Sequence, residues 1–263
     1  MKVELERKVH SYETDTFLKS NKPKILRVSL VKSFLKEFDT PSNKFVDSCM
    51  IDTLKSICTI IPEAKLGYIY DNTMIIVIHD DGNNNFFNRS VMDICTGMSS
   101  MATLTFNTIW HNYLYEFLKS NNIEIKDIDK NKKYSSIVPY VKNNMKAVLH
   151  SSLFEVDTVE DVWGYLTLSQ RLCFTSAVDK VYVDCFKEVP RDEMSNEDKI
   201  QLLKDNGVDF YSYGNKFYKG YVCFKTKKTM EDGSKKSIWL DYVAPTFKAN
   251  KNFVDFIYTD KFI

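Results

Sequence analysis

The sequence lacks the features that mark several large classes of protein. Its 36 lysines and arginines nearly balance its 35 aspartates and glutamates, so the net charge is only +1 and gives no general attraction to nucleic acid. No run of about 18 apolar residues is present, and the charged first residues do not resemble a secretory signal. We therefore expect a soluble, cytoplasmic protein without a membrane partner.

Motifs for metal binding and for common catalytic sites are also absent. None of the 6 cysteines lies in a C-x-x-C pair, and the 4 histidines have no spacing typical of zinc ligands. Most cysteines lie in apolar stretches, which predicts buried, reduced thiols. No P-loop, G-x-G-x-x-G or G-x-S-x-G motif occurs. The sequence therefore predicts neither a zinc site nor one of the common glycine-rich nucleotide sites.

What the sequence does contain is enough apolar material for a sizeable core. Hydrophobic residues make up 44% of its 263 positions, with 18 phenylalanines and 15 tyrosines among them. Lysine greatly outnumbers arginine and asparagine is abundant, which is typical of an AT-rich genome such as that of a bacteriophage.

Hydrophobic periodicity predicts an α+β fold in the first part of the chain. The expected order is a strand at 24–34, a helix from the N-cap Ser42 to about 61, two short strands at 66–69 and 74–78, a helix at 90–117 and a strand at 152–157. The two short strands would be joined by a tight turn at Asp71-Asn72. This order is that of a ferredoxin-like split βαβ unit with an antiparallel sheet, the palm of many polymerases.

The predicted palm-like domain covers residues 1–157 and includes a long polar loop at 119–136. Residues 158–263 are predicted to form helices and a β-hairpin packed on the palm. Thr158 with Asp161 would begin one helix, and Ser195 to Asn206, ended by Gly207, would form another. The hairpin would pair 218–227 with 237–243 around a turn at 232–233.

Several segments resemble a known enzyme family. Arg27-Val-Ser-Leu-Val-Lys-Ser-Phe34 is similar to Arg-Leu-Asp-Gly-Lys-Ser-Phe with one extra residue, and Gly67–Ile76 is similar to Gly-Tyr-Thr-Gln-Ser-Asp-Glu-Ile-Ser-Leu. Residues 154–157 stand where the family has Phe-Asp-Ala-Arg, and Gln170 stands at the Gln of its Trp-Arg-Gln step. In this order, over about residues 24–226, the segments resemble the tRNA-His guanylyltransferase family.

The resemblance implies a polymerase palm that adds a nucleotide to the 5′ end of tRNA. It also implies that Lys32, Ser33 and Phe34 bind the nucleotide, with Mg2+ and GTP or ATP as cofactors if the protein is active. Members of the family form tetramers, which implies a homo-oligomer or a mixed oligomer with an active relative.

The departures from the family pattern fall on the metal-binding positions. Two-metal phosphoryl transfer requires convergent carboxylates. The first family Asp corresponds to Ser29 or Leu30, depending on where the extra residue falls, and the second corresponds to Asn72. Asp71 would supply a catalytic, metal-binding carboxylate beside Asn72 if the turn shifted by one residue. The alternative is that Asp71-Asn72 is ordinary turn chemistry.

Positions that would contact triphosphate and RNA differ as well. A family lysine becomes Asp93, and the Arg of Phe-Asp-Ala-Arg becomes Asp157. The Arg, Asp and Asn of the Trp-Arg-Gln-x-Asp-x-x-x-Asn stretch become Ser169, Leu172 and Ser176. We interpret these changes together as relaxed selection on catalysis.

Three hypotheses for function follow. In the first, the protein is a non-catalytic derivative with an eroded two-metal site, kept for binding RNA or a protein partner. In the second, it is an active nucleotidyltransferase in which Asp71 and either Asp80 or Asp81 converge near Lys32 and Ser33. In the third, it is a structural or assembly subunit.

A basic cluster on the predicted hairpin is the candidate RNA contact. Lysines that alternate with aromatic residues on strands can follow a phosphate backbone while bases stack. The alternative is a solvated hairpin whose charges protect a sheet edge, and the nearby Glu231 and Asp232 weaken the RNA interpretation. The candidate residues are Lys227, Lys228, Lys235 and Lys236.

Overall fold

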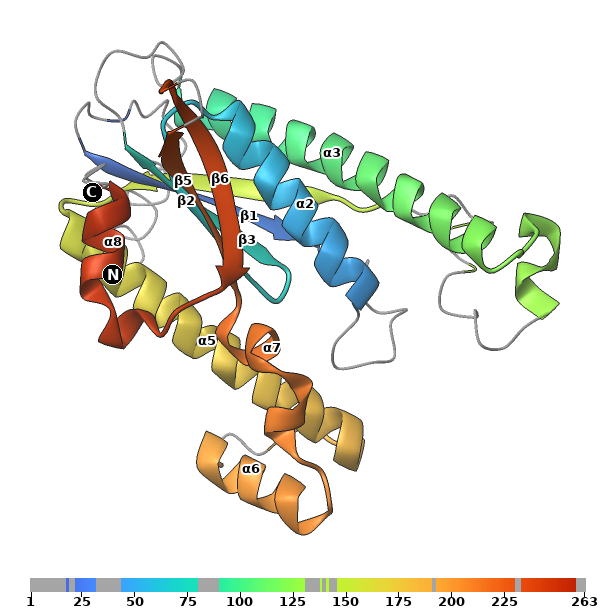
Figure 1. Ribbon diagram of the computed structural model, residues 1–263. Coiled ribbons are helices and arrows are strands. Elements are labelled where there is room, and N and C mark those ends of the chain that lie inside the picture. The colour runs from blue at the N-terminus through green and yellow to red at the C-terminus, as the bar shows by residue number, and fades with distance from the viewer. Residues whose placement is uncertain are drawn as a thin grey trace, which may run out of the picture.

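Figure 1 shows a computed structural model of the chain, in which six strands form one sheet with helices on both faces. It describes residues 18, 22–31, 44–79, 90–130, 138, 141, 146–190, 193–229 and 233–258. Among these residues, no helix is both long and apolar enough to cross a membrane.

The predicted palm order is confirmed. The elements are β1 (Pro23–Leu30), α2 (Lys44–Ile60), β2 (Ala64–Tyr70), β3 (Thr73–His79), α3 (Val91–Ser120) and β4 (Leu149–Glu155). Their strands lie in the order β4-β1-β3-β2, and each neighbouring pair is antiparallel. This is the ferredoxin-like arrangement. Strand β1 ends at Leu30, so Val31 does not belong to it as predicted, and residues 32–34 of the predicted strand lie outside the described residues. Strand β4 begins three residues earlier than predicted.

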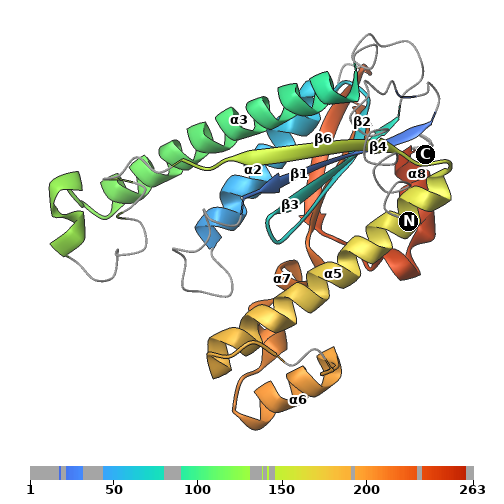
Figure 2. The same ribbon diagram turned by 180° about the vertical axis from the view of Figure 1, so that it is seen from behind.

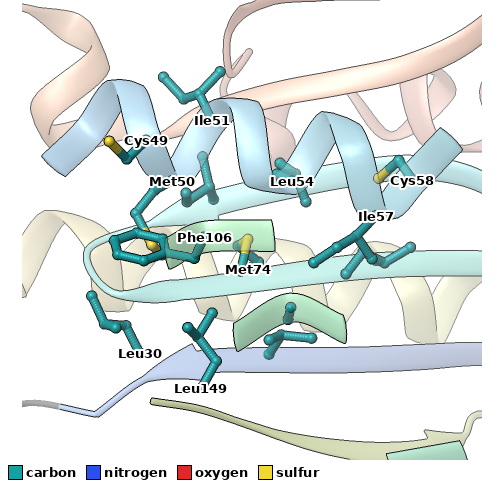
Figure 3. Close-up of a cluster of buried hydrophobic side chains, with 14 of the residues drawn as sticks. Leu30, Cys49, Met50, Ile51, Leu54, Ile57, Cys58, Met74, Phe106 and Leu149 are labelled. Carbon is teal, nitrogen blue, oxygen red and sulfur yellow. The ribbon is translucent and has the colours of Figure 1, made fainter. Parts of the chain in front are cut away.

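One face of the sheet is covered by α2 and α3, which run beside each other in Figure 1. Met50, Leu54 and Ile57 recur on α2 at helical spacing and are fully or almost fully buried. Figure 3 shows Phe106 of α3 between them and the strands. Helical periodicity on α2 and α3 and strand alternation therefore direct apolar side chains into the same layer.

The opposite face is covered by α5 (Val159–Phe186) and by α8 (Lys251–Tyr258). Figure 2 shows α5 leaving the end of β4 and running past the sheet toward α6 (Asn196–Asp205) and α7 (Asn215–Lys219). Val162 and Leu166, near its start, pack on the sheet. Ala177, Val178 and Val181, farther along, form a third core with α6 and the short 3-10 helix η5 (Phe210–Tyr213).

Side-chain caps define where several helices begin. Ser90 caps α3 through the backbone N–H of Asp93, and Thr158 and Ser195 form capping boxes with the third residue of α5 and of α6. Both predicted capped helices of the C-terminal part are thus confirmed. The predicted N-cap Ser42 lies outside the described residues. Within the segment predicted as a loop at 119–136, residues Ile125–Lys130 form the 3-10 helix η3.

The C-terminal hairpin continues the palm sheet. Its strands are β5 (Tyr221–Thr229) and β6 (Lys235–Val243), and β5 pairs with β2 so that Leu66 stands opposite Phe224. The prediction that its first strand begins at Tyr218 is corrected, because α7 extends to Lys219. The predicted boundary at residue 157, between a palm-like domain and a C-terminal region, stays a prediction. A further 3-10 helix, η6 (Phe247–Ala249), connects β6 to α8.

All 6 cysteines are free, as predicted. Cys49, Cys58, Cys173 and Cys223 are buried, whereas Cys95 and Cys185 are only partly so. Burial raises the pKa of Cys49 and of Cys173 to about 12, because a thiolate in an apolar environment loses its hydration. These thiols therefore behave as small apolar side chains.

Candidate functional site

The candidate site lies where the turn between β2 and β3 meets the end of β1. Tyr70 pairs with Thr73, which leaves Asp71 and Asn72 as a two-residue turn without a shift in register. Asp71 has a φ of 50°, the left-handed conformation that Asp and Asn tolerate best after glycine. The turn chemistry predicted from the pair is therefore present.

Asn72 is bound to β1 rather than turned toward solvent. Its side-chain Nδ2 donates to the carbonyl of Leu30 at 2.7 Å, and the Leu30 N–H donates to the carbonyl of Asn72 at 2.8 Å. A carboxylate at position 72 has no proton to donate to that carbonyl. The Asn72 amide, at the position of the second family Asp, thus connects the β2–β3 turn to β1 by hydrogen bonds.

The first family Asp corresponds to Leu30 or to Ser29, and Ser29 also takes part in a neutral hydrogen bond. The hydroxyl oxygens of Ser29 and Thr73 lie 3.1 Å apart between two buried side chains. In the motif alignment, Thr73 follows Asn72 and stands at the family's Glu. The two strand ends are therefore connected by hydroxyl and amide hydrogen bonds at the positions where the family motif has carboxylates.

The carboxylate of Asp71 is directed to α5. Its Oδ2 accepts a hydrogen bond from Ser176 at 3.0 Å, and its Oδ1 lies 2.5 Å from the Lys180 ammonium. Its side chain is 23% exposed, so the pair is partly shielded from solvent. Lys180 was not among the predicted site residues, although it follows Ser176 by one helical turn on α5.

The described residues here do not fit a two-metal centre by themselves. A pair of divalent cations needs several convergent oxygen ligands of negative charge, whereas Asp71 is the carboxylate at the turn and it already has an ammonium partner. Among the described residues, no group of three histidine, cysteine or acidic side chains could hold a metal ion. Five predicted site residues lie outside the described residues, namely Lys32, Ser33, Phe34, Asp80 and Asp81.

Gln170, at the family Gln, makes three backbone hydrogen bonds. Its Nε2 donates to the carbonyls of Lys219 at 3.0 Å and Pro245 at 2.8 Å, and its Oε1 accepts from the Phe247 N–H at 2.9 Å. Tyr68 also donates to the Lys219 carbonyl. Gln170 therefore connects α5 to the segments before β5 and after β6.

The hairpin lysines do not all share one face of the sheet. Strand alternation places Lys227, which pairs with Ser237, on the opposite face from Lys236. Both are exposed. Lys228 stands opposite Lys236 in register, and Lys235 stands opposite Thr229. Lys225 donates to the Pro62 carbonyl. Lys227 and Lys236 therefore lie on opposite faces of the hairpin instead of in one patch.

Sequence reasoning assigned no role to Arg27 or to two nearby tyrosines. Arg27 is the exposed member of the otherwise buried strand β1. An arginine among apolar strand residues was the signal in the sequence that could have marked this position as a candidate site. Burial raises the pKa of Tyr70 and of Tyr165, and the Arg27 guanidinium opposes that rise at both hydroxyls. Arg27, Tyr70 and Tyr165 therefore lie close together on the α5 side of the sheet.

Comparisons with known proteins agree with the motif resemblance. The family model for tRNAHis guanylyltransferase matches residues 6–137. Searched against the curated proteins, the chain has no match.

Solved structures similar to the chain include a bacterial tRNA(His) guanylyltransferase-like protein in complex with ATP. It has 15% identity and a TM-score of 0.70, with 97% of this chain and 98% of that chain covered. A second structure of such a bacterial protein, in complex with GTP, has 14% identity and a TM-score of 0.64, with 98% and 100% covered. The tRNA(His) guanylyltransferase of Saccharomyces cerevisiae has 12% identity and a TM-score of 0.60, with 92% and 98% covered. At these identities the likeness shows the shared fold.

Proposed function

The chain belongs to the tRNA-His guanylyltransferase family, and from that premise we propose that it is a non-catalytic member whose palm is kept for binding RNA or a protein partner. The observation that supports this most directly is the replacement of carboxylates by neutral, mutually hydrogen-bonded groups. Ser29 is paired with Thr73, and Asn72 is paired with Leu30. Magnesium needs anionic oxygen ligands, and these groups are neutral and already paired.

Charge repulsion gives a physical reason for neutral groups at these positions in a palm that no longer binds metal. Carboxylates held together at the end of two strands repel one another unless cations neutralise them. Hydroxyl and amide groups attract one another at the same spacing without any ion. In this proposal, the chain has exchanged a site that depends on metal for strand contacts that stabilise the palm.

An active nucleotidyltransferase that uses Asp71 is the alternative. It requires Asp71 to exchange Lys180 and Ser176 for Mg2+, and it requires Asp80 or Asp81 to approach. GTP or ATP would then be the substrate. In that case, Asp71→Ala abolishes incorporation of labelled GTP into RNA, whereas in our proposal the unaltered protein gives no incorporation above that of Asp71→Ala.

Two kinds of partner fit the proposal. An RNA such as tRNA would contact the lysines at the end of the hairpin. If it does, changing Lys227, Lys228, Lys235 and Lys236 to Ala flattens the salt dependence of RNA affinity.

A protein partner, including a second copy or an active relative, would find an edge at β6, where Leu240 and Tyr242 are 40% and 45% exposed. We place this binding function in the cytoplasm, of the host cell if the protein is encoded by a phage.

Calorimetric titration with GTP and ATP, with and without Mg2+, tests the loss of catalysis. We expect no magnesium-dependent binding of either nucleotide. Heat that appears only with Mg2+ contradicts the proposal and supports a rebuilt active site.

A matched pair of double variants tests whether charge repulsion is the reason for the neutral groups at positions 29 and 72. We expect Ser29→Asp combined with Asn72→Asp to lower the free energy of unfolding in EDTA by about 2–4 kcal/mol, because buried hydrogen bonds are lost and two charges are brought together. Ser29→Ala combined with Asn72→Ala removes the same hydrogen bonds without adding charge. The aspartate pair should be the less stable of the two in EDTA, and 10 mM Mg2+ should narrow that difference. Equal stability in EDTA would show that charge repulsion is not the reason.

A further inference from the structure

Two buried cysteines from distant parts of the chain are in contact with each other. Cys58 lies in the last turn of α2 (Figure 3) and Cys223 lies on β5, and their sulfur atoms are 4.0 Å apart. Cys58 is 1% exposed and Cys223 is 0% exposed. Of the 6 cysteines, all of which the structure describes, no other two are joined by such a contact. The pair therefore differs from the other buried thiols in having a second sulfur beside it.

A glycine on the neighbouring strand makes this contact possible. Gly67 of β2 stands opposite Cys223 in the sheet. A Cβ atom on Gly67 would lie 2.8 Å from the Cys58 sulfur and 2.9 Å from the Cys223 sulfur. Both sulfurs therefore converge on the space that a side chain at position 67 would fill. A disulfide joins its sulfurs at about 2.0 Å, so the two atoms need to approach by about 2 Å.

Few polar contacts attach the C-terminal hairpin to the palm at this point. Strand β5 pairs with β2 over residues 66–69. The ion pair between Lys55 of α2 and Asp241 of β6 is 3.0 Å long, and its side chains are 34% and 37% exposed, so it contributes little stability. Lys225 adds a hydrogen bond to the Pro62 carbonyl. Local opening of such a hairpin requires less free energy than unfolding of the whole sheet.

We propose that Cys58 and Cys223 form a reversible disulfide that connects the hairpin covalently to α2. The oxidant is a small-molecule disulfide such as oxidised glutathione. When the hairpin opens, the Cys223 thiolate attacks one sulfur of the oxidant, which forms a mixed disulfide and releases one thiolate. The Cys58 thiolate then attacks the Cys223 sulfur and releases the second thiolate. The two cysteine protons pass to the released thiolates, so the protein loses two electrons and the oxidant gains them.

Burial restricts this reaction to molecules whose hairpin has opened. Burial raises the pKa of Cys58 well above its ordinary value, so this thiol stays protonated and unreactive while the hairpin is closed. After closure, the same burial shields the disulfide from reductants. The two cysteines are 165 positions apart, and a link across so long a segment restricts the unfolded chain strongly. The inference goes beyond the proposed function and does not depend on whether the palm is catalytic.

Equilibration of the native protein with glutathione tests the pair. Reduced protein is incubated in mixtures of oxidised and reduced glutathione, blocked with N-ethylmaleimide in urea and digested for mass spectrometry. We expect two of the 6 thiols to escape blocking and one pair of peptides to be joined through Cys58 and Cys223. Amide hydrogen exchange in β5 and β6 should then be at least about tenfold slower than in the reduced protein.

Four variants separate the pair from general thiol oxidation. Cys49→Ala is the matched control, because Cys49 is equally buried on α2 without a second sulfur in contact, and it should still form the link. Cys58→Ala should lose both the link and the slower exchange. Gly67→Ala fills the space between the sulfurs and should lower the yield of the link. Lys55→Gln removes the ion pair to Asp241 and should speed formation of the link, because the hairpin opens more easily.

Three results would overturn the proposal. The first is that all 6 thiols are blocked at the most oxidising ratio of glutathione, or that a different pair of cysteines is linked. The second is glutathione attached to Cys223 without a link to Cys58, because the second sulfur would then be out of reach. The third is a link that leaves exchange in β5 and β6 unchanged, because the disulfide would then not hold the hairpin closed.

Discussion

At the scale of single residues, Gly67 sets how closely α2 approaches the sheet. A Cβ atom at this position would lie 2.8 Å from Cys58 Sγ, 2.9 Å from Cys223 Sγ and 2.9 Å from Leu54 Cδ1. All three side chains are buried. Protein interiors are closely packed, so these neighbours cannot all withdraw without moving the helix. The glycine of the family motif therefore has a packing role here.

We predict that Gly67→Ala lowers the free energy of unfolding by about 1–3 kcal/mol, because it overpacks the layer between α2 and β5. Urea denaturation measures the change. Adding Cys223→Ala should recover part of the loss by making room for the methyl group. Gly97→Ala is the control, because a Cβ there meets no atom within 4 Å, and α3 should gain up to about 1 kcal/mol. Destabilisation by both substitutions would contradict the packing explanation.

At the scale of elements, α5 is one helix that serves two cores. Its first turns cover the sheet, and its last turns form the third core with α6 and η5. The same helix contributes Gln170 to the backbone of neighbouring segments and Lys180 to Asp71. Lys199 of α6, whose side chain is only 9% exposed, is paired with Asp179 of α5 at 2.7 Å. Helix α5 thus determines how α6 is attached to the palm.

The capping boxes give an element-scale prediction. Thr158→Ala and Ser195→Ala each remove a side-chain acceptor at a helix start, which costs about 1 kcal/mol. Because α6 is short and contacts mainly α5, we expect Ser195→Ala to speed amide exchange in α6 with little effect on the palm. Thr158→Ala should lower the midpoint of global urea unfolding. Hydrogen exchange read by mass spectrometry distinguishes the two, and palm exchange accelerated by Ser195→Ala would contradict this division.

At the scale of the whole molecule, one continuous six-stranded sheet joins the C-terminal hairpin to the palm, and buried thiols lie in the core between this sheet and α2. Hairpin strand β5 places Cys223 against Cys58 of α2, with the sulfur atoms 4.0 Å apart. Burial raises the pKa of Cys58 as well as those of Cys49 and Cys173. Ionisation of these groups is therefore linked to unfolding of the whole protein.

We predict that stability falls steeply at alkaline pH. A thiol whose pKa rises from 9.0 to about 12 on folding stabilises the fold fully below pH 9, and that contribution is lost as pH rises toward 12. Each such thiol adds up to about 1.4 kcal/mol per pH unit to the slope. Urea unfolding of Cys173→Ala between pH 9 and 12 should give a shallower decline than the unaltered protein. An identical slope would mean that Cys173 is ionised to the same extent in both states.

Local signals in the sequence predicted much of this structure. The alternation in β1, the helical period of α2 and the caps at Thr158 and Ser195 each depend on residues within one or two turns, so they are readable from the chain alone. The start of β4 was not predicted correctly, because it is set by pairing with β1. The helical structure of residues 218–219 was not predicted either, because it depends on packing against α5. The roles of Lys180 and Gln170 depend on contacts 49 to 109 residues away in sequence.

The sequence by itself determined the palm order, the family and the absence of carboxylates at the expected metal positions, because each of these is written in residue types and short spacings. The tertiary structure decided which contacts the residues at those positions make. Only strand pairing brings Asn72 to the Leu30 carbonyl and Ser29 to Thr73, and only the path of α5 brings Lys180 to Asp71 and leaves Arg27 uncovered. Such contacts join residues distant in sequence, and no local pattern specifies them.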